Sequence, residues 1–296
     1  MCLNRELDRM QTLEKLTERF WYQTPVSETD RPILGAVVGN EMTLMIDSGN
    51  SENHAEYFLD ELRKKGIKGP SLVVITHWHW DHIFGLPALN IPSISSAETK
   101  TKMQELLPFS WSDEDLDERV KKGIEIEFCA EAIKKEFPDH RNINIKLPTI
   151  TFHQKLEIDL GGVTCVLQHV GGDHTTDSII VYIKEEKVLF LSDCLYANMY
   201  APKNNYTVDR TLNLLDQLES FDADFYIFSH WKAATKQEFQ TETSMLRCFA
   251  NLTKKFEGNQ QAIEEEYKVQ VKRELTEDER ETLQFFVNGF SLNLHK

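Results

Sequence analysis

THWHWDH (residues 76–82) is the segment of the sequence that decides the fold. It follows SLVVI (71–75), an apolar run that predicts a buried strand. His77 and His79 are two residues apart in an extended segment, so both side chains can face one ion. Asp81 and His82 follow directly and can reach a neighbouring ion. Imidazole and carboxylate groups bind zinc, and also iron or manganese, so the segment predicts a metal site at the end of a strand.

Four further residues with suitable side chains occupy equivalent positions along the chain. Asp47 ends TLMID (43–47) and Asp193 ends KVLFLSD (187–193). His174 follows VTCVLQHV (163–170) after a GGD turn, and His230 ends DFYIFSH (224–230). Any one of them alone is typical of a polar turn residue. Because ends of neighbouring strands meet at one edge of a sheet, their joint placement favours a single site.

The number of candidate ligands predicts two divalent ions. His174 completes a first site with His77 and His79, and His230 completes a second with Asp81 and His82. Asp193 can give one oxygen to each metal, which leaves room for a bridging water.

The remaining pattern predicts an α/β architecture, with strands in groups and helices between them. The first twenty residues have apolar residues at helical spacing, which favours an amphipathic helix. A hairpin is expected over 33–47, and a charged helical insertion over 107–146. We expect a catalytic domain over 1–250 and a helical extension over 251–296.

The ligand pattern resembles the metallo-β-lactamase-fold hydrolase superfamily. HxHxDH, a distant His, an Asp after an apolar strand and a last His cover residues 30 to 231. The resemblance implies an αββα sandwich of two mixed sheets covered by helices, with a dinuclear metal centre at one edge. It also implies that Asp47 lies behind the ligands and steadies the histidine loop.

Within that superfamily, the chain is more similar to the glyoxalase II, lactonase and phosphodiesterase branches, which use a bridging Asp. Cys194 lies one residue after the bridging position, and we interpret it as a packing residue. Tyr196 resembles the tyrosine that polarises the substrate carbonyl in acyl-homoserine lactonases, although packing is an alternative. Trp78 and Lys232 are weaker candidates for substrate contacts, against burial for the tryptophan and a surface position for the lysine.

Composition excludes several functions. The formal charge of −15 argues against nucleic acid and against an anionic membrane surface as partners. The N-terminal segment lacks the apolar run of a signal peptide, and no stretch has the length of a transmembrane helix. The five cysteines form no CxxC pair, so reduced thiols and a cytoplasmic location are expected. The oligomeric state stays open.

The sequence therefore predicts a hydrolase with two divalent ions, zinc above all, in which a metal-bridging hydroxide attacks a small ester, lactone or thioester. In this scheme Tyr196 holds the developing oxyanion and Asp81 carries a proton. A phosphodiesterase of the same fold is the alternative. A metal-binding protein without turnover, such as a sensor, is the alternative from another class.

Overall fold

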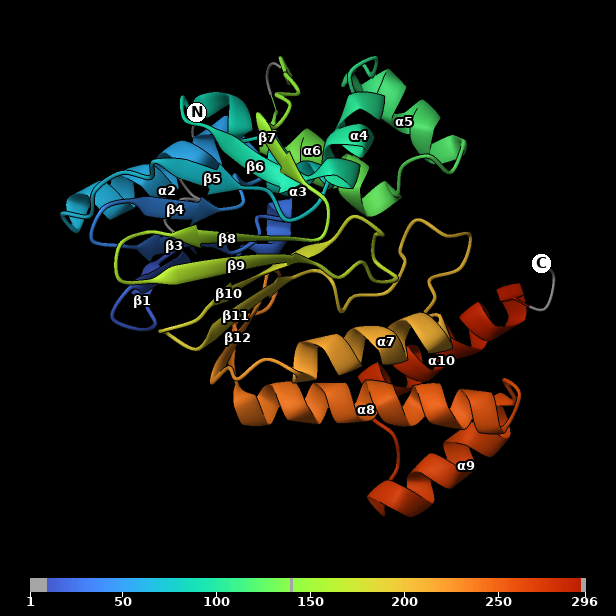
Figure 1. The fold of residues 1–296 in the computed structure, drawn as a ribbon. Helices are drawn as coiled ribbons and strands as arrows, with labels where there is room; N and C mark the ends of the chain where they lie inside the picture. Colours follow the sequence, from blue (N-terminus) through green and yellow to red (C-terminus); the bar gives the residue numbers. More distant parts are fainter. Residues whose placement is uncertain (1–9, 139–140, 294–296) are drawn as a thin grey trace.

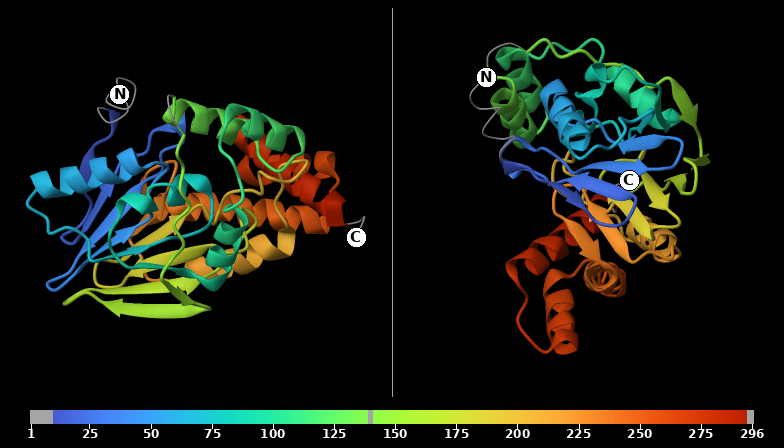
Figure 2. Two further views of the ribbon diagram at one scale, coloured as in Figure 1. Left: turned by 90° about the horizontal axis from the view of Figure 1, so that it is seen from above. Right: turned by 90° about the vertical axis from the view of Figure 1, so that its left-hand side faces the viewer.

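A computed structural model describes residues 10–138 and 141–293 of the chain. Two mixed β-sheets pack face to face, and helices cover the outer face of each sheet (Figure 1). Figure 2 shows the same four layers from the side and from above. The predicted αββα sandwich is confirmed.

The first sheet contains seven strands in chain order. They are β1 (Leu13–Lys15), β2 (Phe20–Gln23), β3 (Leu34–Val38), β4 (Thr43–Ile46), β5 (Leu72–Val74), β6 (Ser93–Ser96) and β7 (Ile150–Phe152). Neighbours are antiparallel from β1 to β4 and parallel from β4 to β7. The expected hairpin over 33–47 is therefore β3 and β4.

The second sheet contains six strands in the order β13-β12-β11-β10-β9-β8. They are β8 (Lys155–Asp159), β9 (Thr164–His169), β10 (Ile179–Ile183), β11 (Val188–Ser192), β12 (Phe225–Phe228) and β13 (Ala233–Thr235). Only the pair β11 and β12 is parallel. These two parallel strands end side by side, so the residues that follow them lie together at one edge.

Helices complete the outer layers. Over the first sheet lie α2 (Glu52–Lys64), α3 (Trp80–Ile83), α4 (Ala97–Glu105), α5 (Asp113–Lys121) and α6 (Glu127–Glu136). Beneath the second lie α7 (Val208–Glu219), α8 (Lys236–Lys255), α9 (Gln260–Val271) and α10 (Glu277–Asn293). Two short 3-10 helices are η1 (Ser27–Thr29) and η2 (Leu86–Ala88). Within the described residues, none of the helices is long and apolar enough to span a bilayer.

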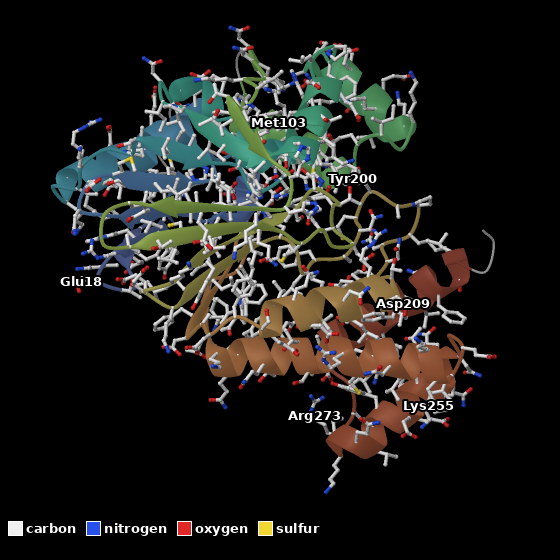
Figure 3. The ribbon with its side chains drawn as sticks, viewed as in Figure 1. Glu18, Met103, Tyr200, Asp209, Lys255 and Arg273 are labelled. Atoms are coloured by element: carbon white, nitrogen blue, oxygen red, sulfur yellow. The ribbon has the colours of Figure 1, made fainter. Side chains whose placement is uncertain are left out.

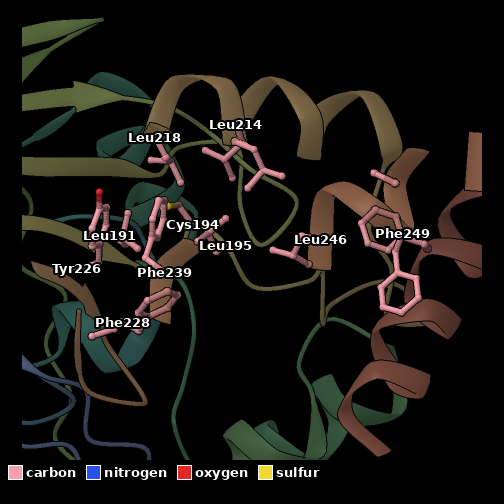
Figure 4. Close-up of a cluster of buried hydrophobic side chains, with 14 of the residues drawn as sticks. Leu191, Cys194, Leu195, Leu214, Leu218, Tyr226, Phe228, Phe239, Leu246 and Phe249 are labelled. Carbon is pink, nitrogen blue, oxygen red and sulfur yellow. The ribbon is translucent and has the colours of Figure 1, made fainter. Parts of the chain in front are cut away.

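The core between the sheets holds the sandwich together. Phe20 of β2 and Phe190 of β11 are fully buried and meet edge to face across the layers, with ring centroids 6.5 Å apart. Each such aromatic side chain contributes about 1.5–3 kcal/mol by burial. A second core lies under the C-terminal helices, where Tyr226 stacks on Phe239 of α8 with centroids 3.8 Å apart (Figure 4).

The predicted N-terminal helix is wrong for the described residues. Residues 1–9 lie outside them, and 13–15 and 20–23 form β1 and β2. Phe20 is fully buried in the sandwich, and β2 pairs with β3. Burial and sheet pairing therefore outweigh the helical spacing of a few apolar residues.

The insertion over 107–146 contains two helices, α5 and α6. Ser112 caps α5 by accepting a hydrogen bond from the backbone N–H of Asp115. Near the chain end, α8 runs continuously through residue 250, so the proposed start of the extension lies within one helix.

Candidate metal centre

The structure brings all seven predicted ligands together at one edge of the sandwich. They come from the ends of β5, β11 and β12 and from the β9–β10 loop. Their ligand atoms form two groups, and within each group these atoms lie within 4.8 Å of one another. The first group is His77, His79 and His174; the second is Asp81, His82, Asp193 and His230.

In the first group the imidazoles present different nitrogens to a common point. His77 Nε2 lies 3.1 Å from His79 Nδ1. The ring of His174 lies 4.5 Å from the ring of His79 and 5.3 Å from that of His77, measured between centroids. Three imidazoles in this arrangement suit one face of a tetrahedral zinc ion.

The second group combines imidazole and carboxylate. Asp81 Oδ2 lies 2.8 Å from His82 Nε2 and 3.1 Å from His230 Nε2. Because α3 begins at Trp80, Asp81 and His82 lie in one helical turn, not in the extended segment that holds His77 and His79. This change of backbone directs the two halves of the motif to different groups.

Asp193 lies between the two groups. Its Oδ2 atom is 3.7 Å from His77 Nε2 and 3.6 Å from His174 Nε2. The same oxygen is 3.1 Å from His82 Nε2 and 3.3 Å from His230 Nε2. One carboxylate oxygen thus faces nitrogens of both groups, as a ligand shared by two metals would.

Polar atoms without hydrogen bonds test whether metal ions fit here. Among the described residues, both ring nitrogens of His174 and Oδ1 of Asp193 are buried and have no hydrogen-bond partner. Leaving a buried polar group unsatisfied costs about 1–3 kcal/mol. A cation bound to His174 and Asp193 would remove this penalty, so the residues present fit a metal centre.

The electrostatics of the cluster also favour a bound cation. Burial lowers the pKa of His77 and His79 well below the ordinary value, which leaves neutral imidazoles with a free lone pair. Burial opposes ionisation of Asp193, but His230 and His82 hold the pKa of this carboxyl well below its usual range. Burial also disfavours the charged form of His82, yet Asp81 and the other carboxylates raise its pKa well above normal. The cluster attracts positive charge.

Backbone conformation at the strand ends aims the ligands. Ser192, directly before Asp193, has a φ of 52° and turns the chain sharply at the end of β11. Gly172 has a φ of 136°, and a Cβ there would lie 2.6 Å from the carbonyl oxygen of Cys194. Only glycine allows this approach, which brings the loop that carries His174 against the segment after β11.

Asp47 lies behind the second group, where the sequence placed it. Its Oδ2 atom is 2.8 Å from His82 Nδ1, so the opposite ring nitrogen faces Asp81 and Asp193. Thr76 donates two hydrogen bonds to Asp47, from its backbone N–H at 2.8 Å and its hydroxyl at 2.9 Å. The carboxylate is thereby fixed and in turn fixes the ring of His82.

Asp30 has an equivalent position behind His230, and the sequence analysis missed it. Asp30 Oδ1 lies 3.2 Å from His230 Nδ1, while His230 Nε2 faces Asp81. Asp30 follows η1 and has a φ of 56°. It has no ligand spacing to any histidine along the chain, so only the fold reveals this contact.

A cavity of ≈140 Å³ opens onto both ligand groups. Tyr196 lines it, and its ring centroid lies 6.0 Å from that of His174 and 6.2 Å from that of His230. The insertion forms one wall through the segment 126–129, and the loop after β11 contributes Tyr200. Figure 3 shows Tyr200 between the two helical layers, beyond the strand ends.

The other candidates have partners of their own. Trp78 packs against the ring of His79, with centroids 4.7 Å apart, and donates a hydrogen bond to Thr175 at 3.0 Å, so it supports a ligand. Lys232 forms an ion pair with Glu238. Cys194 is buried in the core under the C-terminal helices, in agreement with its interpretation as a packing residue (Figure 4).

Comparison with known proteins agrees with this geometry. Residues 35–230 match the family model of the metallo-beta-lactamase superfamily. The structure is similar to a metallo-beta-lactamase from Pontibacter korlensis, with a TM-score of 0.56, 19% identity, and coverage of 79% of this chain and 96% of that one. It is also similar to the DIM-1 metallo-beta-lactamase, with a TM-score of 0.53, 18% identity, and coverage of 79% and 95%. At these identities the structural likeness concerns the fold.

Two curated relatives carry named activities. The chain is 25% identical over 219 residues to the human acyl-coenzyme A thioesterase MBLAC2, and the match covers 67% of this chain and 74% of that protein. It is 24% identical over 225 residues to a linear primary-alkylsulfatase of Pseudomonas sp. (strain ATCC 19151). That match covers 67% of this chain but spans only 41% of the sulfatase. The predicted class, a hydrolase, is confirmed, and the chain belongs to the metallo-beta-lactamase superfamily.

Proposed function

We propose that the protein hydrolyses an acyl ester, thioester or lactone at a centre of two divalent metal ions, with zinc as the first candidate. The observation that carries the proposal is the position of Asp193 Oδ2, which faces nitrogens of both ligand groups. His77, His79 and His174 would hold one ion, and Asp81, His82 and His230 the other. Bound ions would lower the pKa of a shared water and polarise the substrate oxygen.

The protein's own residues would orient the substrate and exclude water. Tyr196 lines the cavity beside both groups. Burial raises the pKa of its hydroxyl well above the ordinary value, so at neutral pH the hydroxyl can donate a hydrogen bond to the developing oxyanion. Asp47 and Asp30 would keep the rings of His82 and His230 in place. The role of Asp81 as a proton carrier stays a prediction.

The protein lining of the cavity, apart from the metal ions, favours a neutral acyl group over a phosphodiester. Among the described residues that line it, none is Lys or Arg, whereas Asp30, Asp81 and Asp193 are present. Phosphate recognition in proteins commonly uses Arg or Lys. The match to an acyl-coenzyme A thioesterase supports the same choice. The match to an alkylsulfatase makes a sulfate ester the second candidate.

A substrate panel tests the proposal. Purified protein is loaded with zinc or manganese and assayed with p-nitrophenyl acetate, acetyl-coenzyme A, a homoserine lactone, decyl sulfate, bis-p-nitrophenyl phosphate and nitrocefin. We expect turnover of acyl substrates that is lost on chelation and in His77→Ala. Turnover of decyl sulfate or the phosphodiester alone would contradict the acyl assignment. Metal binding without any turnover would favour the sensor alternative.

A further inference from the structure

We propose that the metal cavity includes a subsite for a hydrocarbon chain, formed by Ile126, Phe128 and Met199, here called the apolar rim. The inference rests on the proposed acyl hydrolysis and adds the substrate class, an ester or thioester of an apolar acid. Ile126 and Phe128 come from the insertion, and Met199 from the loop after β11.

The cavity has two chemically different parts. The ligand side carries imidazoles and carboxylates, and the opposite wall is apolar. A substrate that fits both parts has a polar reacting group joined to a hydrocarbon portion. An anionic or strongly polar acyl chain that lies against the apolar rim would lose its hydration without gaining polar partners. If it stays in water instead, the apolar rim is left uncovered.

Solvent exposure indicates that the apolar rim lacks a covering within the described chain. The side chain of Phe128 is 57% exposed and that of Met199 is 36% exposed. Large apolar side chains gathered at the mouth of a polar site are typical of a ligand-binding surface.

A hydrogen bond fixes the two halves of the apolar rim relative to the metal ligands. Tyr200 donates to Glu125 Oε1 at 2.9 Å, which joins the loop after β11 to the insertion. The ring of Tyr200 also packs against His79, with centroids 5.2 Å apart. The insertion is anchored by its own buried residues, including Leu116 and Ile133. The surface is thus held in place before a ligand arrives.

The size of the cavity limits how much of the chain it can enclose. A volume of ≈140 Å³ corresponds to about five water molecules at roughly 30 Å³ each. This volume includes the space beside the apolar rim, and the reacting group takes part of it. The remainder of a longer acyl chain therefore has to extend outward along Phe128 and Met199, whose side chains are partly exposed.

The test compares acyl chain lengths in the zinc-loaded, full-length protein. The substrates are p-nitrophenyl acetate, butyrate and octanoate, and the variant is Phe128→Ser combined with Met199→Ser. We expect kcat/KM of the unaltered protein to rise with chain length. In the variant the octanoate-to-acetate ratio should fall about 10-fold, while the metal content stays unchanged. The single variant Phe128→Leu, which keeps an apolar side chain, should retain most of the native octanoate-to-acetate ratio.

A matched control removes exposed apolar side chains elsewhere, with Leu107→Ser and Val269→Ser, which are 52% and 74% exposed in the native chain. The control should keep the native ratio. Acyl turnover with a ratio that does not change in the rim variant, or that falls equally in the control, would overturn the subsite but leave the proposed function intact.

If no acyl substrate is turned over, a binding measurement tests the hydrocarbon subsite separately from the proposed acyl hydrolysis. Calorimetry compares octanoate with acetate on the zinc-loaded protein. Tighter binding of octanoate that is lost in the rim variant supports the subsite even where acyl hydrolysis fails. Equal affinity for octanoate and acetate in the unaltered protein overturns the subsite.

Discussion

Asp30 Oδ1 lies 3.2 Å from His230 Nδ1, on the side of the imidazole opposite to the nitrogen that faces Asp81 and Asp193. Asp47 has the same relation to His82, with its oxygen 2.8 Å from Nδ1. Each ring in the second group is therefore held from behind by a carboxylate, and these contacts set which nitrogen is offered to a metal.

Asp30→Asn should weaken metal binding in the second group more than in the first. The amide carries no charge to hold the His230 ring, and such changes typically reduce metal affinity by about 10- to 100-fold. Zinc titration by calorimetry should show one tight site retained and one weakened. Asp60→Asn, on the exposed face of α2, is the control and should bind zinc normally. Equal weakening of both sites would contradict the assignment.

Asp193→Ala should remove the shared ligand and abolish both the binding of two metal ions and hydrolysis. Cys194→Ala, one residue later, should keep both, because Cys194 is buried in the core away from the ligand groups. Metal content by elemental analysis, measured together with turnover, checks the pair of variants. A metal-replete, fully active Asp193→Ala protein would show that Asp193 is no ligand.

Tyr196→Phe should lower kcat by about 100- to 1,000-fold with little change in metal content, since it removes one donor to a developing oxyanion. Tyr182→Phe provides the control, because the Tyr182 hydroxyl donates to the Asp222 carbonyl at 2.8 Å on the second sheet. Steady-state kinetics on the best panel substrate gives the measurement. A pure rise in KM at constant kcat would point to substrate binding instead, and unchanged kcat and KM would point to packing.

Glu136→Ala should destabilise the fold strongly. Arg31 Nη2 lies 2.8 Å from Glu136 Oε1, and both side chains are fully buried. Ser51 donates a hydrogen bond to the same carboxylate oxygen at 2.6 Å. Removing one partner of a buried pair costs about 3–5 kcal/mol. Chemical denaturation gives the free energy of unfolding, and Glu118→Ala, whose carboxylate pairs with Lys122 at the surface, should change it by less than about 1 kcal/mol.

Glu279→Gln should change how stability depends on pH. Hydrogen bonds from Arg273 are the largest cause that lowers the pKa of Glu279 to about 2 from the ordinary 4.5. A carboxyl with a lowered pKa stabilises the fold above its unfolded pKa, and this contribution is lost as pH falls through the folded pKa. The native protein should therefore exceed the variant in stability at pH 7, and this difference should shrink from pH 4.5 toward pH 2.

Urea denaturation at several pH values, with chelator present throughout, measures the effect of Glu279→Gln. Glu265→Gln in α9 is the control, and its free energy of unfolding should change with pH in the same way as that of the native protein. A stability difference between native and Glu279→Gln proteins that stays constant below pH 4.5 would exclude the Arg273 contact as its source.

The sequence by itself determined the fold class and the seven candidate ligand residues that converge in the structure. Their positions could be inferred because apolar runs mark the strands, and a sheet brings the ends of its strands to one edge. The division of the motif was also visible: the spacing assigns His77 and His79 to one ion, and Asp81 and His82, which follow directly, to a neighbouring one.

Only the tertiary structure decided what surrounds the ligands. Asp30 contacts His230 across 200 residues of chain, and Phe128 and Met199 line one cavity only because the insertion folds over the loop after β11. The strands β1 and β2 replaced an expected helix for the same reason. Such contacts depend on burial and pairing between distant segments, and local spacing carries no record of which segments will meet.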